Sequence, residues 1–184
     1  MFDYTSRPAN IRKLNAVCKA FIAEIAPACE RCENPDIHYY KVSANAGFGI
    51  HADEDFEIDM QYNYPSIAND LLCTKAFNRF VHDNWKYTRG FAGITLTILH
   101  EMGHWATYPH LSKRFDRVKA LAKMYQENEK KNFSVYELQM YYMTHFEDER
   151  KATEWGMNWL ADAQNRKTAK AFEKAFFKCW KGEE

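Results

Sequence analysis

The sequence predicts an α+β domain that is mostly helical and carries a small antiparallel sheet. Two observations support this class. Between residues 37 and 62, apolar and polar residues alternate with a period of two, which is typical of half-buried strands. Before and after this segment, apolar residues recur every three or four positions, as in amphipathic helices. One short sheet with several helices is the composition of an α+β domain.

The length and composition favour a single domain that covers residues 1–184. Hydrophobic residues make up 46% of the chain and aromatic residues 16%, while glycine and proline number only 7 and 5. A chain of this size can bury one continuous core, and so few glycines and prolines do not favour long disorder. No internal repeat or low-complexity linker divides the sequence.

The first expected element is a helix that follows Pro8 and stops at Pro27. Its apolar positions are Ile11, Leu14, Val17, Cys18, Phe21, Ile22 and Ile25. Two or three short antiparallel strands are expected next, within IHYYKVS, FGIH and FEIDMQY. The order of elements at the start of the chain is therefore helix and then sheet.

After Pro65 the helical pattern returns and continues to the end of the chain. The pattern breaks near Gly90, near Pro109, at residues 127–132 and near Asn165. The last helix carries an apolar stripe that we expect to close the core, formed by Phe172, Phe176, Phe177 and Trp180.

Charge and hydropathy argue against two kinds of partner, membranes and nucleic acids. Lys plus Arg and Asp plus Glu number 25 each, so no overall field attracts a phosphate backbone or an anionic membrane surface. No apolar run approaches the roughly 18 residues of a membrane span, and the first residues lack a signal-peptide pattern. We therefore expect a cytoplasmic protein, with neither a membrane nor a nucleic acid as its partner. The oligomeric state and the role of the Cys29 and Cys32 pair stay open.

The stretch HEMGH, at positions 100 to 104, predicts a zinc site on a helix. His100 and His104 lie about 40° apart on a helical wheel, so that one face presents both imidazoles. Neutral imidazole is a good zinc ligand, and Glu101 between the two histidines can accept a proton from a zinc-bound water. Gly103 has no side chain, which would let a second helix approach closely.

A second long helix, expected to begin at Ser134 and to run without a break past residue 160, supplies the candidate third ligand. Glu149 is the lone acid on its apolar, small-residue face, which it shares with Leu138, Tyr142, His145, Ala152, Thr153, Gly156, Leu160 and Ala163. Glu147 and Glu154 fall on the polar side. Periodicity therefore selects Glu149, with His145 as the runner-up.

HEMGH with a downstream Glu149-Arg-Lys-Ala152 resembles the compact gluzincin metallopeptidases, especially ImmA/IrrE-like proteins. HEMGHWAT is also similar to a short stretch of the metallopeptidase domain of ArdC-type antirestriction proteins. The first resemblance implies a gluzincin-like core, His100, His104 and Glu149 as zinc ligands, and Glu101 as the general base. Thr153 departs from the family pattern, which usually has Asn or Asp there to orient a ligand histidine; its hydroxyl can still accept an imidazole N–H.

Peptide hydrolysis also needs a donor that stabilises the oxyanion, and Tyr142 and His145 are the candidates. Each has an ordinary alternative, a packed tyrosine and an outer-shell histidine. The sequence thus predicts a zinc-dependent metallopeptidase that cuts a peptide bond in a protein or peptide substrate. The alternative is a non-enzymatic interaction protein, regulatory or antirestriction-like, that is clamped by zinc.

The strand FEIDMQY, residues 56–62, is a candidate edge strand for binding the substrate backbone by β-augmentation. Its polar face is acidic, as is the preceding HADED, which would suit a basic substrate segment. An acidic face that keeps an exposed edge in solution is the alternative.

Overall fold

The computed structural model describes residues 11–29, 36–41, 49–52, 56–62, 67–107 and 114–183. These residues form two compact units. Unit 1 combines residues up to Leu71 with Trp159–Glu184, and unit 2 is Leu72–Asn158. The boundaries between the units fall inside two helices, α2 (Ile67–Asn84) and α6 (Glu147–Trp159). Whether the chain folds as the single domain 1–184 stays a prediction.

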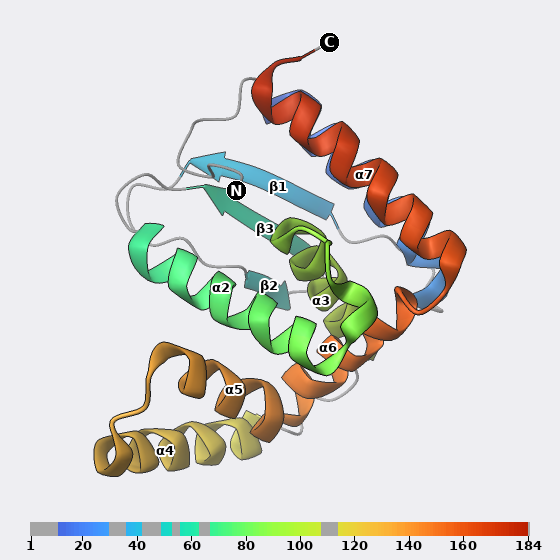
Figure 1. Ribbon diagram of the computed structural model, residues 1–184. Helices are drawn as coiled ribbons and strands as arrows, with labels where there is room; N and C mark the ends of the chain where they lie inside the picture. Colours follow the sequence, from blue (N-terminus) through green and yellow to red (C-terminus); the bar gives the residue numbers. More distant parts are fainter. Residues whose placement is uncertain are drawn as a thin grey trace. The chain divides into compact units, whose positions relative to one another are not determined.

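Unit 1 contains two long helices and a three-stranded sheet (Figure 1). Its elements are α1 (Ile11–Ile25), the short 3-10 helix η1 (Ala26–Cys29), β1 (Asp36–Lys41), β2 (Gly49–Ala52), β3 (Phe56–Tyr62) and α7 (Ala163–Lys181). The predicted first helix is present, and three strands lie in the segments where two or three were expected. Pro27 lies within η1, two residues after the end of α1.

The sheet is mixed, which corrects the predicted antiparallel pairing. Its order is β1-β3-β2; β1 pairs with β3 in parallel and β2 pairs with β3 in antiparallel fashion. β3, the FEIDMQY segment, is therefore the central strand and not the free edge expected for binding a substrate. Alternation of apolar and polar residues predicts a strand, but it does not distinguish an edge strand from a central one.

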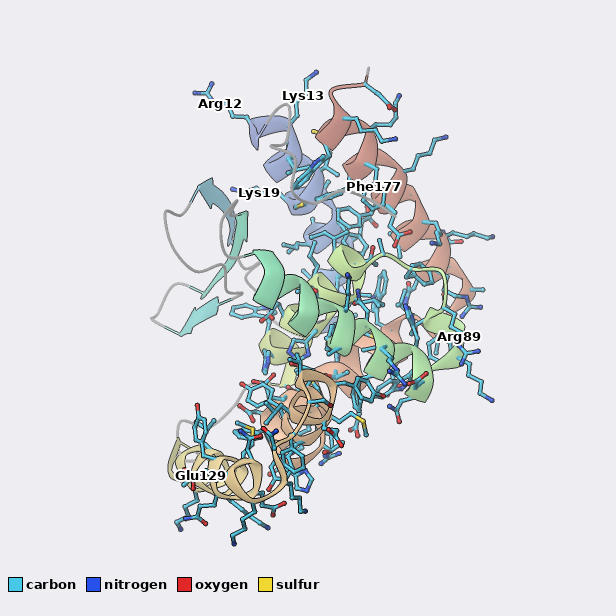
Figure 2. The ribbon with its side chains drawn as sticks, turned by 60° about the vertical axis from the view of Figure 1, so that its left-hand side comes forward. Arg12, Lys13, Lys19, Arg89, Glu129 and Phe177 are labelled. Atoms are coloured by element: carbon cyan, nitrogen blue, oxygen red, sulfur yellow. The ribbon has the colours of Figure 1, made fainter. Side chains whose placement is uncertain are left out.

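The described core of unit 1 lies between α1 and α7, which run side by side (Figure 2). Phe21 of α1 stacks on Phe172 of α7, with ring centroids 4.2 Å apart, and meets the edge of Trp159 at 6.0 Å. The predicted apolar stripe of the last helix is confirmed as core at Phe172, Phe176 and Trp180, which are buried, whereas Phe177 is only half-buried. Figure 2 shows Arg12, Lys13 and Lys19 of α1 extending outward from the helix.

The start of α7 is fixed by an N-cap that the sequence break near Asn165 signals. The Asp162 carboxylate accepts hydrogen bonds from the backbone N–H groups of Gln164 and Asn165, at 2.7 and 3.1 Å. These bonds lower the pKa of Asp162, because they favour its charged form. At the other end, Gly182 adopts a left-handed conformation with φ 74°, which closes the helix.

Unit 2 is helical throughout its described residues. Its elements are the larger part of α2 (Ile67–Asn84), the short η2 (Lys86–Thr88), α3 (Gly93–Thr107), α4 (Arg114–Lys131), α5 (Val135–His145) and all but the last residue of α6 (Glu147–Trp159). α3 carries HEMGH and ends at Thr107, as the pattern predicts; Pro109 lies outside the described residues. The break at Gly90 is a turn in which glycine has a φ of 92°.

The long helix predicted from Ser134 is in fact two helices, α5 and α6, separated at Phe146. The expected capping box is present, because Ser134 and Glu137 exchange hydrogen bonds at the start of α5. Phe146 then takes an extended conformation, with φ −94° and ψ 111°, and its side chain is only 2% exposed. Three consecutive acids at 147–149 begin α6, where the helix dipole favours negative charge. That acidic run was the overlooked signal for a new helix.

The predicted fold class is wrong as stated. The structure describes seven α-helices, and every buried side chain that it describes lies on a helix or on a turn beside one. The part of the chain that the structure describes is thus mainly helical. Its short strands form a mixed sheet and not the expected antiparallel one. The strands span four to seven residues, whereas the α-helices span 11 to 19. None of the helices that the structure describes is long and apolar enough to cross a membrane.

Candidate metal centre

Two glycines allow the backbones of α3 and α6 to cross in direct contact within unit 2. A Cβ atom added at Gly103 would collide with the carbonyl oxygen of Ala152 and lie 2.7 Å from its carbonyl carbon. A Cβ at Gly156 would likewise collide with the Leu99 carbonyl. The close approach proposed for Gly103 is therefore confirmed. It places one turn of α6, at Glu149 to Thr153, against the histidine face of α3.

The crossing brings His100, His104 and Glu149 together as a group that can hold a metal ion. Glu149 Oε2 lies 3.1 Å from His100 Nε2 and 3.3 Å from His104 Nε2, and the two nitrogens are 3.2 Å apart. Three donors about 2.0 to 2.1 Å from a tetrahedral zinc ion would lie about 3.3 Å from one another. The donor set therefore fits one face of a zinc tetrahedron.

Thr153 fixes which nitrogen of His100 faces this group. Its hydroxyl donates to the backbone carbonyl of Glu149 at 2.8 Å and lies 2.9 Å from His100 Nδ1. With its hydrogen committed to Glu149, the hydroxyl oxygen accepts a hydrogen bond from His100 Nδ1–H. His100 Nε2 is then the nitrogen that faces Glu149 and His104, and it is the one available to ligate a metal ion. The Thr153 hydroxyl can thus orient His100, as Asn or Asp usually does in the compact gluzincins that the motif resembles.

The charges of the three side chains are coupled. Burial opposes ionisation of Glu149, but hydrogen bonds and charge from His100 and His104 outweigh it and hold the pKa of Glu149 well below its usual range. For His104, burial lowers the pKa, but the hydrogen bond to Glu149 and nearby carboxylates raise it overall. The carboxylate is therefore ionised at neutral pH, which is the form that binds a cation.

Glu101 is buried beside the three candidate ligands without being one of the group. Burial raises the pKa of Glu101; the charges of His100 and His104 oppose that shift, and the Glu149 carboxylate adds to it. Glu101 is therefore close enough to the three candidate ligands to interact with their charges. A carboxylate whose proton is held more tightly than usual is suited to accepting one from water.

The structure separates the two predicted oxyanion donors. Tyr142 of α5 reaches the centre, because its hydroxyl donates to Glu149 Oε1 at 2.8 Å. His145 is exposed; its ring stacks on Tyr141 at 3.9 Å, and its Nδ1 lies near Thr144 Oγ1 and the Tyr141 carbonyl. All of these contacts of His145 are within α5, and it is not part of the ligand group. Because the helix breaks at Phe146, Tyr142 and His145 do not share one helical face with Glu149.

One neighbour of the site was missed in the sequence. Phe77 of α2 presents its ring to the His100 imidazole, with centroids 5.4 Å apart at 66°. Its signal was the apolar pattern of α2, where Ala76, Phe77, Phe80 and Val81 are all buried. The two rings pack against each other, and both residues are buried. The other open question, the cysteine pair, stays open: Cys29 is buried in η1, and Cys32 lies outside the described residues.

The comparisons with known proteins add no family to this geometry. No protein-family model, curated protein or solved structure matches the chain. The similarity to compact gluzincins therefore rests on the residues of α3 and α6 alone. The structure itself shows a mainly helical protein in which His100, His104 and Glu149 form a group that can bind a metal ion.

Proposed function

We propose that the protein is a zinc-dependent peptidase, of the compact gluzincin type, that hydrolyses a peptide bond in a protein or peptide substrate. The observation that carries the proposal is Glu101, a buried carboxylate next to three metal ligands that is not itself one of them. Burying such a group is costly, and a purely structural site gains nothing from it. A hydrolytic site needs it as a general base.

The ligand count also supports an enzyme over a structural clamp. Structural zinc sites have four protein ligands, whereas catalytic sites have three and keep a position open. Among the described residues, the ligand group has three members. The His104 side chain is 19% exposed, compared with 8% for His100 and 7% for Glu149, so the group is most open to solvent at His104. Water and substrate would enter from that side.

When bound, a zinc ion supplies a Lewis acid that polarises the peptide carbonyl and makes water more acidic. The protein's own residues supply the proton transfer and the alignment. The Glu101 carboxylate accepts the proton of the attacking water and returns it to the leaving amine. Thr153 keeps the His100 ring in the required tautomer, and the ionised Glu149 balances the positive charge.

Metal content is the first test of this proposal. We expect one zinc ion per chain after mild dialysis of reduced, folded protein, because three ligands converge at one point. Elemental analysis measures the ratio. A folded sample that retains no zinc would end the peptidase proposal, and two ions per chain would direct attention to Cys29 and Cys32.

Glu101→Gln is expected to retain zinc and the fold but to lose hydrolysis, by at least about 100-fold, because the amide can accept a hydrogen bond but not a proton. Proteomics of protein termini, in cells that express either the native chain or the variant, measures the activity. New termini should appear only with the native chain. Glu154→Gln, at an exposed ion pair with Arg150, is the matched control and should cleave normally.

If the native chain binds zinc and yields no new termini, the non-enzymatic alternative gains support. If Glu101→Gln yields the same termini as the native chain at a similar rate, Glu101 is not the base.

A further inference from the structure

The Glu149 carboxylate is shared between two sets of partners. Its Oε2 faces the two imidazoles, at 3.1 and 3.3 Å, while its Oε1 accepts a hydrogen bond from the Tyr142 hydroxyl at 2.8 Å. The two residues lie on opposite sides of the break between α5 and α6. One oxygen is thus directed at the metal ligands and the other at the phenol.

The turn at Phe146 aims the phenol. The Phe146 backbone N–H donates to the Tyr142 carbonyl at 3.2 Å, and the two rings pack with centroids 4.5 Å apart. Phe146 is 2% exposed, so its ring anchors the turn in the interior of unit 2. Tyr142 therefore approaches Glu149 from a fixed direction. Its position does not depend on the helical face that the two residues were expected to share.

A glutamate needs such a partner to act as a ligand of defined geometry. The last torsion of a glutamate side chain is broad and roughly two-fold, so an unrestrained carboxylate can exchange its oxygens or present both. Hydrogen bonds from an outer shell normally remove this freedom at metal sites. In this protein the Tyr142 hydroxyl restrains Glu149, and the Thr153 hydroxyl restrains His100 in the same way.

We infer that Tyr142 is a positioning residue that holds Glu149 as a ligand through one oxygen, Oε2. This inference rests on the proposed metal centre. The phenol hydrogen is donated to Glu149, so the same group is not the donor for a substrate oxyanion. This role through Glu149 is proposed in place of the oxyanion donor expected from the sequence.

Tyr142→Phe tests the inference, because it removes the hydroxyl and keeps the ring that packs on Phe146. We expect the zinc affinity, measured by competition with a chelator of known affinity, to fall about 10 to 100-fold. Tyr141→Phe is the matched control: Tyr141 is the adjacent buried tyrosine of α5, and its ring stacks on His145. This control should bind zinc as the native chain does.

A double-mutant cycle shows whether Tyr142 acts through Glu149. In a Glu149→Ala background, Tyr142→Phe should change the remaining zinc affinity by less than about twofold. The visible spectrum of the cobalt-loaded protein should also change in Tyr142→Phe and not in Tyr141→Phe, because a released carboxylate can offer a second oxygen.

Native affinity in Tyr142→Phe, or an equal loss in the Glu149→Ala background, would overturn the inference. Both results leave the peptidase proposal standing, because they concern Tyr142 alone. If the native chain itself binds no zinc, the metal centre is wrong and the inference falls with it. Circular dichroism of each metal-free variant confirms that a change in affinity is not a loss of fold.

Discussion

Glu149→Ala is expected to lose tight zinc binding while the metal-free chain stays folded. The variant removes one of three ligands, so the affinity should fall by more than the roughly 100-fold that an outer-shell partner contributes. Metal binding adds to stability, by about 2.7 kcal/mol when zinc is 100 times its dissociation constant. For a domain of this size, losing that contribution lowers the melting temperature by about 5 to 10 °C.

Two acids on the same helix provide controls for this variant. Glu147 forms an exposed ion pair with Lys151, and Glu154 forms one with Arg150. Exposed pairs of this kind contribute little, so Glu147→Ala and Glu154→Ala should each change stability by about 0.5 kcal/mol and keep the native zinc affinity. Zinc titration of the three variants decides the assignment. Native affinity in Glu149→Ala, with a loss in Glu154→Ala, would contradict it.

Gly103→Ala is expected to destabilise the protein by about 3 kcal/mol and to weaken zinc binding, because the new methyl group would collide with the Ala152 carbonyl. The sign of this effect is informative. Alanine is intrinsically better than glycine inside a helix by about 1 kcal/mol, so a looser crossing would make the variant more stable. Thermal unfolding of the metal-free protein and zinc titration measure the two effects separately.

Two further glycine variants provide a second test of the helix crossing and a control. Gly156→Ala should behave like Gly103→Ala, since its methyl group would meet the Leu99 carbonyl. Gly90 has a φ of 92° and open space around it. Gly90→Ala should therefore lose about 1 kcal/mol through backbone strain and keep the native zinc affinity. A stabilised Gly103→Ala would mean that α3 and α6 do not cross in contact.

The ligand group was predictable because each of its parts depends on local spacing. His100 and His104 are one turn apart on α3, and Glu149 shares a face with Ala152 and Gly156 entirely within α6. The break at Phe146 does not disturb that face. The contact between Tyr142 and Glu149 was not predictable in its geometry, because a turn without glycine or proline redirects α5.

The pairing of the sheet could not be predicted for a different reason. Alternation in FEIDMQY reports that one face of a strand is more apolar than the other. It contains no information about which strand lies on either side, or in which direction that strand runs. The alternation therefore does not predict the parallel pairing of β1 with β3 or the central place of β3.

The crossing of α3 and α6 also has a consequence for the order of events in folding. His100 and His104 are neighbours on one helix, but Glu149 is 49 positions from His100 along the chain. Contacts between distant segments form more slowly than those within a helix. During refolding, an added zinc ion would meet the two histidines first and bind them weakly. Tight capture of the ion would then mark the moment at which α6 docks against Gly103.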